Sequence, residues 1–165
     1  MTAVVGGSFD PFTIGHDDLV RRAVRLFGQV VVGVGINSAK DYLLTLDERV
    51  NLTRASLADL PSVRVELMPG LLADFCRQHG ARTIVKGARS GSDFDVEVAL
   101  AQMNASYDDL ETVILPSRPA WGFISSTLVR QAARGGADIS QYVPPAVANY
   151  WRQRPNPQPS STVEQ

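Results

Sequence analysis

Four short, mainly apolar runs and one segment that alternates apolar and charged residues, VRVEL at 63–67, divide the chain. They lie at residues 2–5, 29–36, 63–67, 83–87 and 112–116. Continuous apolar runs of this length, such as QVVVGVGI at 29–36, are typical of strands that are buried on both faces of a parallel sheet. Each run is followed by polar or glycine-rich residues, as expected where a strand ends in a loop. The pattern therefore predicts five strands.

Segments of helical periodicity lie between these runs. After the first run, residues 17–27 place Leu19, Val20, Ala23, Val24 and Phe27 on one face, which is typical of an amphipathic helix. The second segment opens with TLDE, a capping-box pattern. Further helices are predicted at residues 45–60, 71–79, 94–107 and 125–134, and after the two prolines at 144–145.

The alternation of strand and helix predicts the α/β class. We expect a Rossmann-like, doubly wound, five-stranded parallel sheet with helices on both faces, in a single domain over residues 1–154. Residues 155–165 are rich in Pro and Ser and lack periodicity, so a disordered C-terminal tail is predicted. In such folds ligands bind beyond the carboxyl ends of the strands, where the polar loops of this chain fall.

Composition excludes several classes of partner and site. The net charge of −1 over 165 residues gives no electrostatic case for a nucleic-acid partner. No signal peptide or membrane-length apolar run is visible, so we expect a cytoplasmic protein without a membrane contact. The one cysteine, Cys76, excludes an internal disulfide and lies in an apolar stretch, which favours a buried thiol. No cluster of Cys and His has metal-ligand spacing, so no metal site built by side chains is expected.

The loop GGSFDPFTIGH at residues 6–16 joins the first predicted strand to the first predicted helix. Gly6 and Gly7 let the backbone approach a ligand closely. His16 lies at the helix start, where the partial positive charge of the helix favours an anion. A lone histidine is more often structural, but one at this place is a candidate to act on a bound phosphate. The second histidine, His79, falls at a helix C-terminus, where contact with the helix dipole and solvent is the simpler expectation.

Lysine is rare in this chain. Of the 16 basic residues only Lys40 and Lys86 are lysines, and each lies at or just beyond the end of a predicted strand. Arginine and lysine differ most at phosphate and bidentate sites, so the two lysines are candidates for phosphate contacts. Codon bias that has left two lysines by chance explains the count equally well.

Three consecutive hydroxyl residues, Ser125, Ser126 and Thr127, begin the helix predicted at 125–134. Backbone N–H and side-chain O–H groups are expected to converge there on one spot, which would suit a phosphate. A plain N-cap needs only one hydroxyl and remains an alternative.

These motifs resemble those of a known superfamily. TIGH at 13–16 resembles the T/HxGH signature of the nucleotidyltransferases, and FISST at 123–127 resembles their second signature. Within that superfamily the chain is most similar to the bacterial phosphopantetheine adenylyltransferase family, up to about Trp151. The matching blocks occur in that family's order and approximate spacing: GSFDPFTIGH, LDERV, VKGAR, DFDVE, AQMN and FISSTLVR.

The resemblance implies an activity and its partners. The reaction is the reversible transfer of AMP from ATP to 4′-phosphopantetheine, which gives dephospho-coenzyme A and pyrophosphate in the penultimate step of coenzyme A biosynthesis. The acceptor phosphate attacks the α-phosphorus of ATP directly and in line, so no nucleophilic side chain is needed. The resemblance also implies Mg²⁺ bound mainly through the ATP phosphates, feedback binding of coenzyme A, and a homohexamer.

Residue roles follow from the resemblance only where the motifs match. His16, Lys40 and Arg89 are carried over as catalytic residues, with His16 stabilising charge on the α-phosphate in the transition state. The acceptor site would comprise Ser8, Lys40, Leu72 and Lys86, with Leu72 lining the pantetheine channel. The ATP site would comprise Ser8, Phe9, His16, Gly87, Ala88, Arg89, Glu97, Trp121, Gly122, Phe123, Ile124, Ser125, Ser126 and Thr127.

The chain departs from the family pattern at a few positions. Gly6 stands where proline is common, Arg130 where lysine is common, and Thr127 keeps the hydroxyl of the usual third serine. Val96 replaces a usual tyrosine, which puts details of nucleotide contact and subunit packing in doubt.

Two other functions stay open. A sister nucleotidyltransferase with nicotinamide mononucleotide or glycerol phosphate as acceptor shares both signatures, although VKGAR and DFDVE argue against it. A non-catalytic nucleotide-binding module would be expected to lack His16 or the two lysines, and all three are present.

Overall fold

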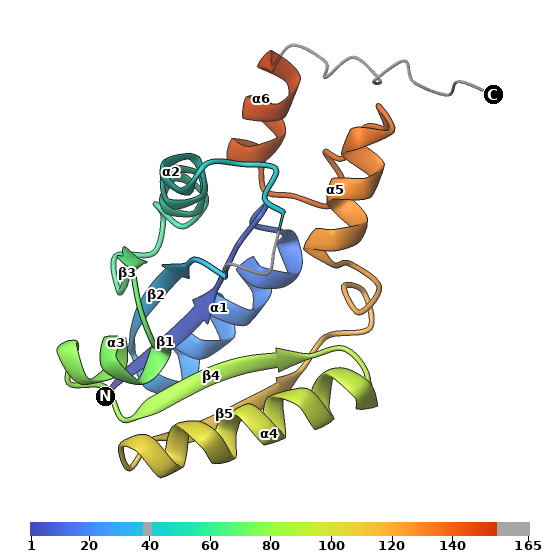
Figure 1. Ribbon diagram of the computed structural model, residues 1–165. Helices are drawn as coiled ribbons and strands as arrows, with labels where there is room; N and C mark the ends of the chain where they lie inside the picture. The colour runs from blue at the N-terminus through green and yellow to red at the C-terminus, as the bar shows by residue number, and fades with distance from the viewer. Residues whose placement is uncertain (38–40, 155–165) are drawn as a thin grey trace.

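The computed structural model describes residues 1–37 and 41–154. Lys40 and the tail predicted at 155–165 lie outside the described residues. The strands are β1 (Thr2–Gly7), β2 (Gln29–Gly35), β3 (Val63–Met68), β4 (Thr83–Ala88) and β5 (Glu111–Pro116). The helices are α1 (Ile14–Phe27), α2 (Leu46–Ser56), α3 (Leu72–Gln78), α4 (Gly91–Tyr107), α5 (Ser126–Arg134) and α6 (Pro145–Gln153). Strand and helix alternate through β5 (Figure 1), as the sequence predicts.

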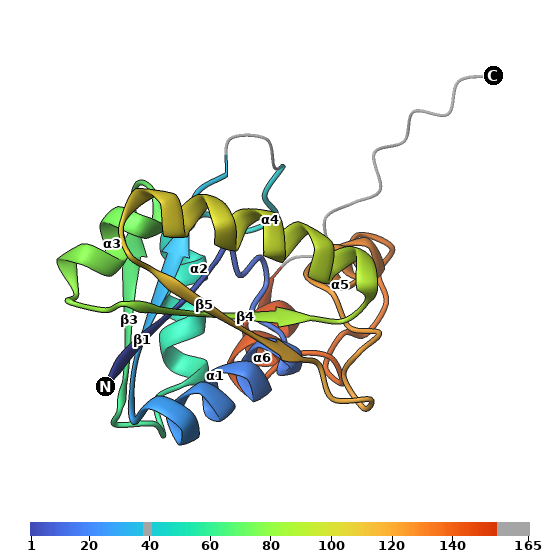
Figure 2. The same cartoon turned by 90° about the horizontal axis from the view of Figure 1, so that it is seen from below.

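The strands form one parallel sheet in the order β3-β2-β1-β4-β5. Alternate residues of β1 belong to two separate cores: Ala3 and Val5 to the core shared with α1 and α2, and Val4 to the core shared with α3. Helices α3 and α4 lie on one face of the sheet and α1 on the other (Figure 2). The doubly wound α/β fold is therefore confirmed. No helix in the described ranges has the length and apolar character to cross a membrane.

A seam divides the sheet between β1 and β4. β1 pairs with β2 along its whole length, but it pairs with β4 only at Ala3–Thr83 and Val4–Ile84. Beyond these two pairs the strands diverge (Figure 1). The strand order also reverses here, and the chain leaves β1 and β4 toward helices on opposite faces. Such a switch point is where open α/β sheets leave a crevice for ligands.

Some predicted helix bounds were wrong. α1 begins at Ile14, three residues before the predicted start, because Thr13 already caps it. α4 begins at Gly91 rather than at 94, because Ser90 accepts the Asp93 N–H as a cap. α2 ends at Ser56 and is followed by turn residues at 57–59, so the helix stops short of the predicted end at 60.

His79 was also misassigned as a solvent-facing residue. Its side chain is only 13% exposed and lies 3.4 Å from the Glu66 carboxylate. Its ring centroid is 4.5 Å from that of Phe75, so the histidine forms part of the α3 packing.

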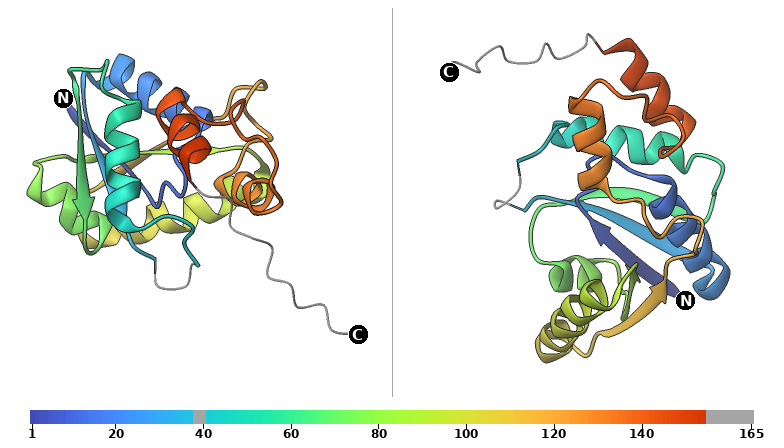
Figure 3. Two further views of the ribbon diagram at one scale, coloured as in Figure 1. Left: turned by 90° about the horizontal axis from the view of Figure 1, so that it is seen from above. Right: turned by 90° about the vertical axis from the view of Figure 1, so that its right-hand side faces the viewer.

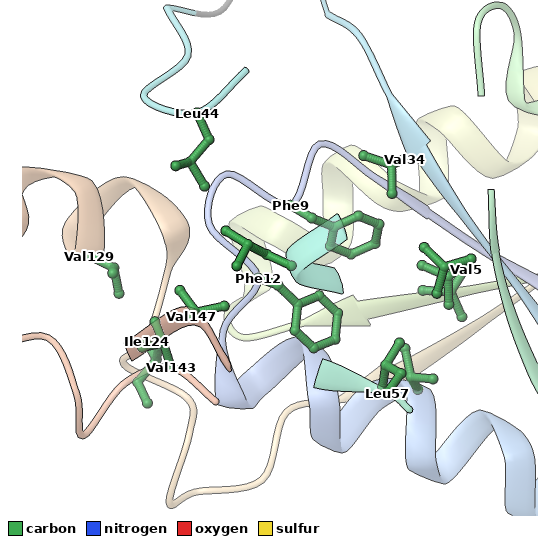
Figure 4. Packing of buried hydrophobic residues seen from close by; sticks show 14 of the residues in the cluster. Val5, Phe9, Phe12, Val34, Leu44, Leu57, Ile124, Val129, Val143 and Val147 are labelled. Carbon is green, nitrogen blue, oxygen red and sulfur yellow. The ribbon is translucent and has the colours of Figure 1, made fainter. Parts of the chain in front are cut away.

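The loop after β1 is anchored by two aromatic side chains. Phe9 and Phe12 are 4% and 1% exposed and pack among residues from distant parts of the chain. Figure 4 shows them between the strand residues Val5 and Val34 on one side and Ile124 on the other. Burying two phenylalanines is worth about 1.5–3 kcal/mol each, enough to fix a loop that is otherwise rich in turn residues.

The last two helices cover the end of the sheet from which this loop emerges. α6 packs against α2, and α5 follows the long connection after β5 (Figure 3). Ile14 N–H donates to the Tyr142 carbonyl, which ties the start of α1 to the connection between α5 and α6. These elements bring the second signature motif next to the first.

Candidate active site

A cavity of about 400 Å³ lies over the seam, at the carboxyl edge of the sheet. Its walls come from the ends of β1 and β4, the first turns of α1 and α5, the N-terminal part of α4 and the connection after β5. The volume falls in the range of small-molecule sites. The sequence-based expectation that polar loops meet at this edge is confirmed.

His16 is held in one orientation by Thr13. The Thr13 backbone N–H donates to His16 Nδ1 at 3.0 Å, and the His16 N–H donates to Thr13 Oγ1 at 3.3 Å. This is a capping box in which histidine takes the place usually filled by Glu or Gln. Because Nδ1 accepts a hydrogen bond, the proton of the neutral ring is on Nε2. The helix start thus fixes the tautomer as well as the position of the ring.

Aromatic packing fixes the ring plane. The His16 ring is edge-on to Phe9, with centroids 5.1 Å apart, and tilted against Phe12 at 5.5 Å. Phe9 has φ of 48°, a left-handed conformation that is unusual for a large side chain. A residue held in that conformation beside a cavity is a sign of a functional constraint.

Two cations at the end of β4 are each paired with a carboxylate of α4. Lys86 Nζ lies 3.1 Å from Glu97 Oε2, and both side chains are about one-fifth exposed. Arg89 donates to Asp93 through Nε at 2.8 Å and reaches toward the Ile124 carbonyl at 3.5 Å. The hydrogen bond from the Arg89 guanidinium lowers the pKa of Asp93, so this carboxylate is ionised at neutral pH.

The opposite wall carries a second set of ion pairs. Asp18 Oδ1 lies 3.1 Å from Arg118 Nε, and Asp18 Oδ2 lies 3.5 Å from Arg22 Nη1. Arg130 lies 3.8 Å from the buried carboxylate of Asp10. Without a ligand, each of these cavity arginines therefore already has a carboxylate neighbour. A bound phosphate would either replace these carboxylates as the partner of an arginine or bind beside them.

The three hydroxyl residues at the start of α5 all line the cavity, and each hydroxyl has a hydrogen-bond partner in the protein. Ser125 Oγ accepts the Leu128 N–H as the helix cap. Ser126 Oγ donates to the Pro11 carbonyl at 2.9 Å, and Thr127 Oγ1 accepts from Arg130. Ser126 thus uses its O–H within the protein, whereas Ser125 and Thr127 only accept hydrogen bonds and keep their O–H groups for a ligand. The first N–H groups of α5 remain suited to an anion.

Most of the predicted site residues meet in this cavity. Of the predicted site residues, those that line it are Ser8, Phe9, His16, Lys86, Gly87, Arg89, Glu97, Trp121, Ile124, Ser125, Ser126 and Thr127. The predicted site residues that do not line it are Leu72, Ala88, Gly122 and Phe123. Lys40 lies outside the described residues. Leu72 is nevertheless close to the cavity floor, because its Cδ1 lies 2.8 Å from the place where a Cβ on Gly6 would be.

Sequence reasoning missed two buried charged residues beside the loop. Asp10 is 1% exposed and accepts the N–H groups of Leu43 and Leu44. Arg49 is 2% exposed, although it was assigned only to a motif on α2. Arg49 lies one helical turn after Leu46 and on the buried side of α2 with Thr53. Its helical spacing from the apolar Leu46 is a feature of the sequence that could have indicated that Arg49 is buried.

The carboxylates of the cavity do not form a metal site of their own. In residues 1–37 and 41–154 no group of three or more His, Cys, Asp or Glu side chains is placed to hold a metal ion. Asp18, Asp93 and Glu97 each face a cation instead. These residues fit a magnesium ion only as one that arrives with ligand phosphates.

Comparison with known proteins agrees with this geometry. Residues 4–132 match the model of the cytidylyltransferase-like family, a span that runs from β1 into α5. The chain is 47% identical over 144 residues to the phosphopantetheine adenylyltransferase of Cutibacterium acnes, covering 87% of this chain and 92% of that protein.

Two more relatives carry the same name. The phosphopantetheine adenylyltransferase of a Nocardioides species is 48% identical, with 88% of this chain and 91% of that protein covered. That of Frankia casuarinae is 47% identical, with 92% and 96% covered. The chain thus belongs to the cytidylyltransferase-like family and, within it, to the phosphopantetheine adenylyltransferases.

Proposed function

We propose that this chain is an enzyme that transfers AMP reversibly from ATP to 4′-phosphopantetheine, giving dephospho-coenzyme A and pyrophosphate. The observation that carries the proposal is His16, whose tautomer and orientation are fixed by Thr13 in a cavity lined with cations. The names of relatives that match along nearly their whole length support the choice of acceptor.

The proposed chemistry needs positioning and charge stabilisation rather than a covalent intermediate. The acceptor phosphate attacks the α-phosphorus of ATP in line, one new P–O bond forms, and the bond to pyrophosphate breaks. His16 donates from Nε2 to an oxygen of the α-phosphate as negative charge builds there. The capping box contributes by holding the donor in place before the substrates arrive.

Cations and helix ends hold the other phosphates in this proposal. Arg89 and the first N–H groups of α5 bind the ATP phosphates, and Lys86 and Lys40 hold the acceptor and reacting phosphates. Magnesium bound with ATP would supply positive charge that offsets the charge on the phosphates. Lys86 Nζ lies 3.1 Å from the Glu97 carboxylate. When a ligand phosphate binds, Lys86 would either move away from Glu97 or contact both the carboxylate and the phosphate.

The remaining binding residues follow the motifs. Ser8 would contact both substrates, and Leu72 would line the pantetheine channel beside Gly6. Phe9, Gly87, Ala88 and Glu97 would contact ATP, together with Trp121, Gly122, Phe123, Ile124, Ser125, Ser126 and Thr127.

We also propose a homohexamer, feedback binding of coenzyme A and a cytoplasmic location. An exposed apolar stripe on α4 supports self-association: Val96, Leu100, Met103 and Tyr107 are 38–62% exposed at helical spacing. Coenzyme A shares its adenylate and pantetheine parts with the substrates, so it would compete for the same cavity. A pool of ATP supports the cytoplasm as the place of action.

The test is release of pyrophosphate from ATP and magnesium, with phosphopantetheine, nicotinamide mononucleotide and glycerol phosphate compared as acceptors. We expect release with phosphopantetheine only, and none without an acceptor. Release with another acceptor alone would replace the substrate and keep the role of His16. No release with any acceptor, despite ATP binding, would favour a non-catalytic nucleotide-binding module.

A further inference from the structure

Arg49 is a buried arginine that ties two strand ends together. Its Nη1 donates to the Ser8 carbonyl, just beyond β1, and to the Gly35 carbonyl at the end of β2, both at 2.7 Å. The guanidinium also lies over the Tyr42 ring, 4.1 Å from its centroid. These contacts hold the cavity loop against the neighbouring strand, although Arg49 does not itself line the cavity.

The charge of Arg49 has no counter-ion in the described part of the chain. No carboxylate there lies within 4.0 Å of it, and its buried Nε has no hydrogen-bond partner. A buried cation without a carboxylate is costly, and the two carbonyl oxygens and the Tyr42 ring compensate its charge only in part. An anionic ligand in the neighbouring cavity would supply the missing negative charge.

The hydrogen bond to Ser8 also sets the direction of a peptide group. A trans peptide is planar, so its carbonyl and its N–H point in opposite directions. With the Ser8 carbonyl turned to Arg49, the N–H of Phe9 points away from Arg49. Ser8 and Phe9 both line the cavity, and no acceptor among the described residues receives the Phe9 N–H. An unpaired N–H in left-handed backbone beside a cavity is typical of a concave anion site.

We propose that Arg49 is a positioning residue for the phosphates of ATP: it holds the Ser8–Phe9 peptide with its N–H toward them and adds a permanent positive charge behind that peptide. The inference rests on the proposed function only in that the ligand is a nucleotide polyphosphate. It assigns Arg49 no contact with the reacting atoms.

The test compares Arg49→Lys and Arg49→Met with a matched control, Arg54→Lys. Arg54 lies on the same helix and also donates to a strand carbonyl, that of Val65 at 3.0 Å, but it is exposed and outside the cavity lining. For each protein we would measure the melting temperature, the affinities for magnesium-ATP and for adenosine, and kcat and KM below the melting transition.

Loss of a hydrogen bond to a charged group predicts a decrease of about tenfold to a hundredfold in ATP affinity for Arg49→Met. We expect a smaller decrease for Arg49→Lys, which keeps the charge but cannot match the planar guanidinium contact with both carbonyls and the tyrosine ring. Adenosine affinity should stay within about twofold in both variants, because adenosine carries no phosphate. Arg54→Lys should match the wild type in every ligand measurement.

A purely structural role for Arg49 would lower the melting temperature and leave ATP affinity and kcat/KM unchanged. That result would overturn the inference, and so would a parallel loss of ATP and adenosine affinity. Failure of the proposed function would show separately, as a wild-type protein that binds ATP but releases no pyrophosphate with phosphopantetheine. The comparison of ATP with adenosine would still test Arg49 in that case.

Discussion

Replacing His16 by two different residues separates its chemical role from its structural one. His16→Ala removes the imidazole and with it the hydrogen bond from the Thr13 N–H, while the bond from the backbone N–H of residue 16 to Thr13 Oγ1 remains. His16→Gln removes the imidazole, but glutamine at this third helical position can reach back to the N-cap N–H as in an ordinary capping box. The two variants therefore share the chemical loss and differ in the cap.

The expected magnitudes differ for the two roles. Removing one donor to developing negative charge lowers kcat by about 10²–10³, or about 2.7–4 kcal/mol, and both variants should show this loss. Losing the hydrogen bond from the Thr13 N–H costs about 1 kcal/mol, so only His16→Ala should be clearly less stable. For a chain of this size that corresponds to a decrease of about 2–4 °C in melting temperature.

The assay is initial-rate pyrophosphate release with saturating ATP, magnesium and phosphopantetheine, together with ATP titration and thermal unfolding of each variant. We expect ATP affinity to change little, since the imidazole acts on charge that develops only in the transition state. Normal turnover in His16→Gln would refute the transition-state role. A large loss of ATP affinity with unchanged turnover of bound substrate would refute it as well.

Three further outcomes follow from buried or paired groups. Asp10→Ala leaves two backbone N–H groups and the Arg130 guanidinium without their carboxylate. The free energy of unfolding, measured in urea, should therefore fall by about 3 kcal/mol. A decrease of less than about 1 kcal/mol would contradict these contacts. Burial raises the pKa of Cys76 to about 11, so a thiol reagent at pH 8 should react at least about 100-fold more slowly with native than with unfolded protein. Hydrogen bonds from Arg89 lower the pKa of Asp93 in the folded protein. The ionised Asp93 side chain therefore stabilises the fold at pH values above the ordinary aspartate pKa of about 4, and this stabilisation is lost as the pH falls through the lowered pKa of the folded state. Asp93→Asn should therefore melt below the wild type at pH 7 and level with it once Asp93 is protonated; an equal difference at both pH values would contradict the pairing.

Local patterns in the sequence were sufficient for the elements and the fold class. Most strands are mainly apolar runs, β3 alternates apolar residues with Arg64 and Glu66, and the loop between β1 and α1 carries glycines and a histidine in a recognisable order. The error at the start of α1 has a local cause, because Thr13 was not considered as a cap. His16 consequently lies within the first turn rather than before it, and its ring is oriented by the helix itself.

Contacts between distant residues could not be predicted in this way. Ser126 was expected to face a phosphate, but its hydroxyl donates to the Pro11 carbonyl, 115 positions away in the chain. Arg49 bonds to Ser8, 41 positions away, and only the packing of α2 shows that its charge is buried. Periodicity reports which face of a helix is apolar, but it does not report which carbonyl a buried side chain will meet.

The seam between β1 and β4 bears on how the chain folds during synthesis. The central strand of the sheet, β1, is made first; β2 can add to one of its edges and β3 can add to β2 as soon as they leave the ribosome. Its other edge waits for β4, which begins at residue 83, and then gains only two registered pairs. Pairings across such a sequence separation form late, because the loop entropy must be overcome first. We therefore expect the nascent chain to hold a three-stranded half before the second half docks, so that the cavity is completed last.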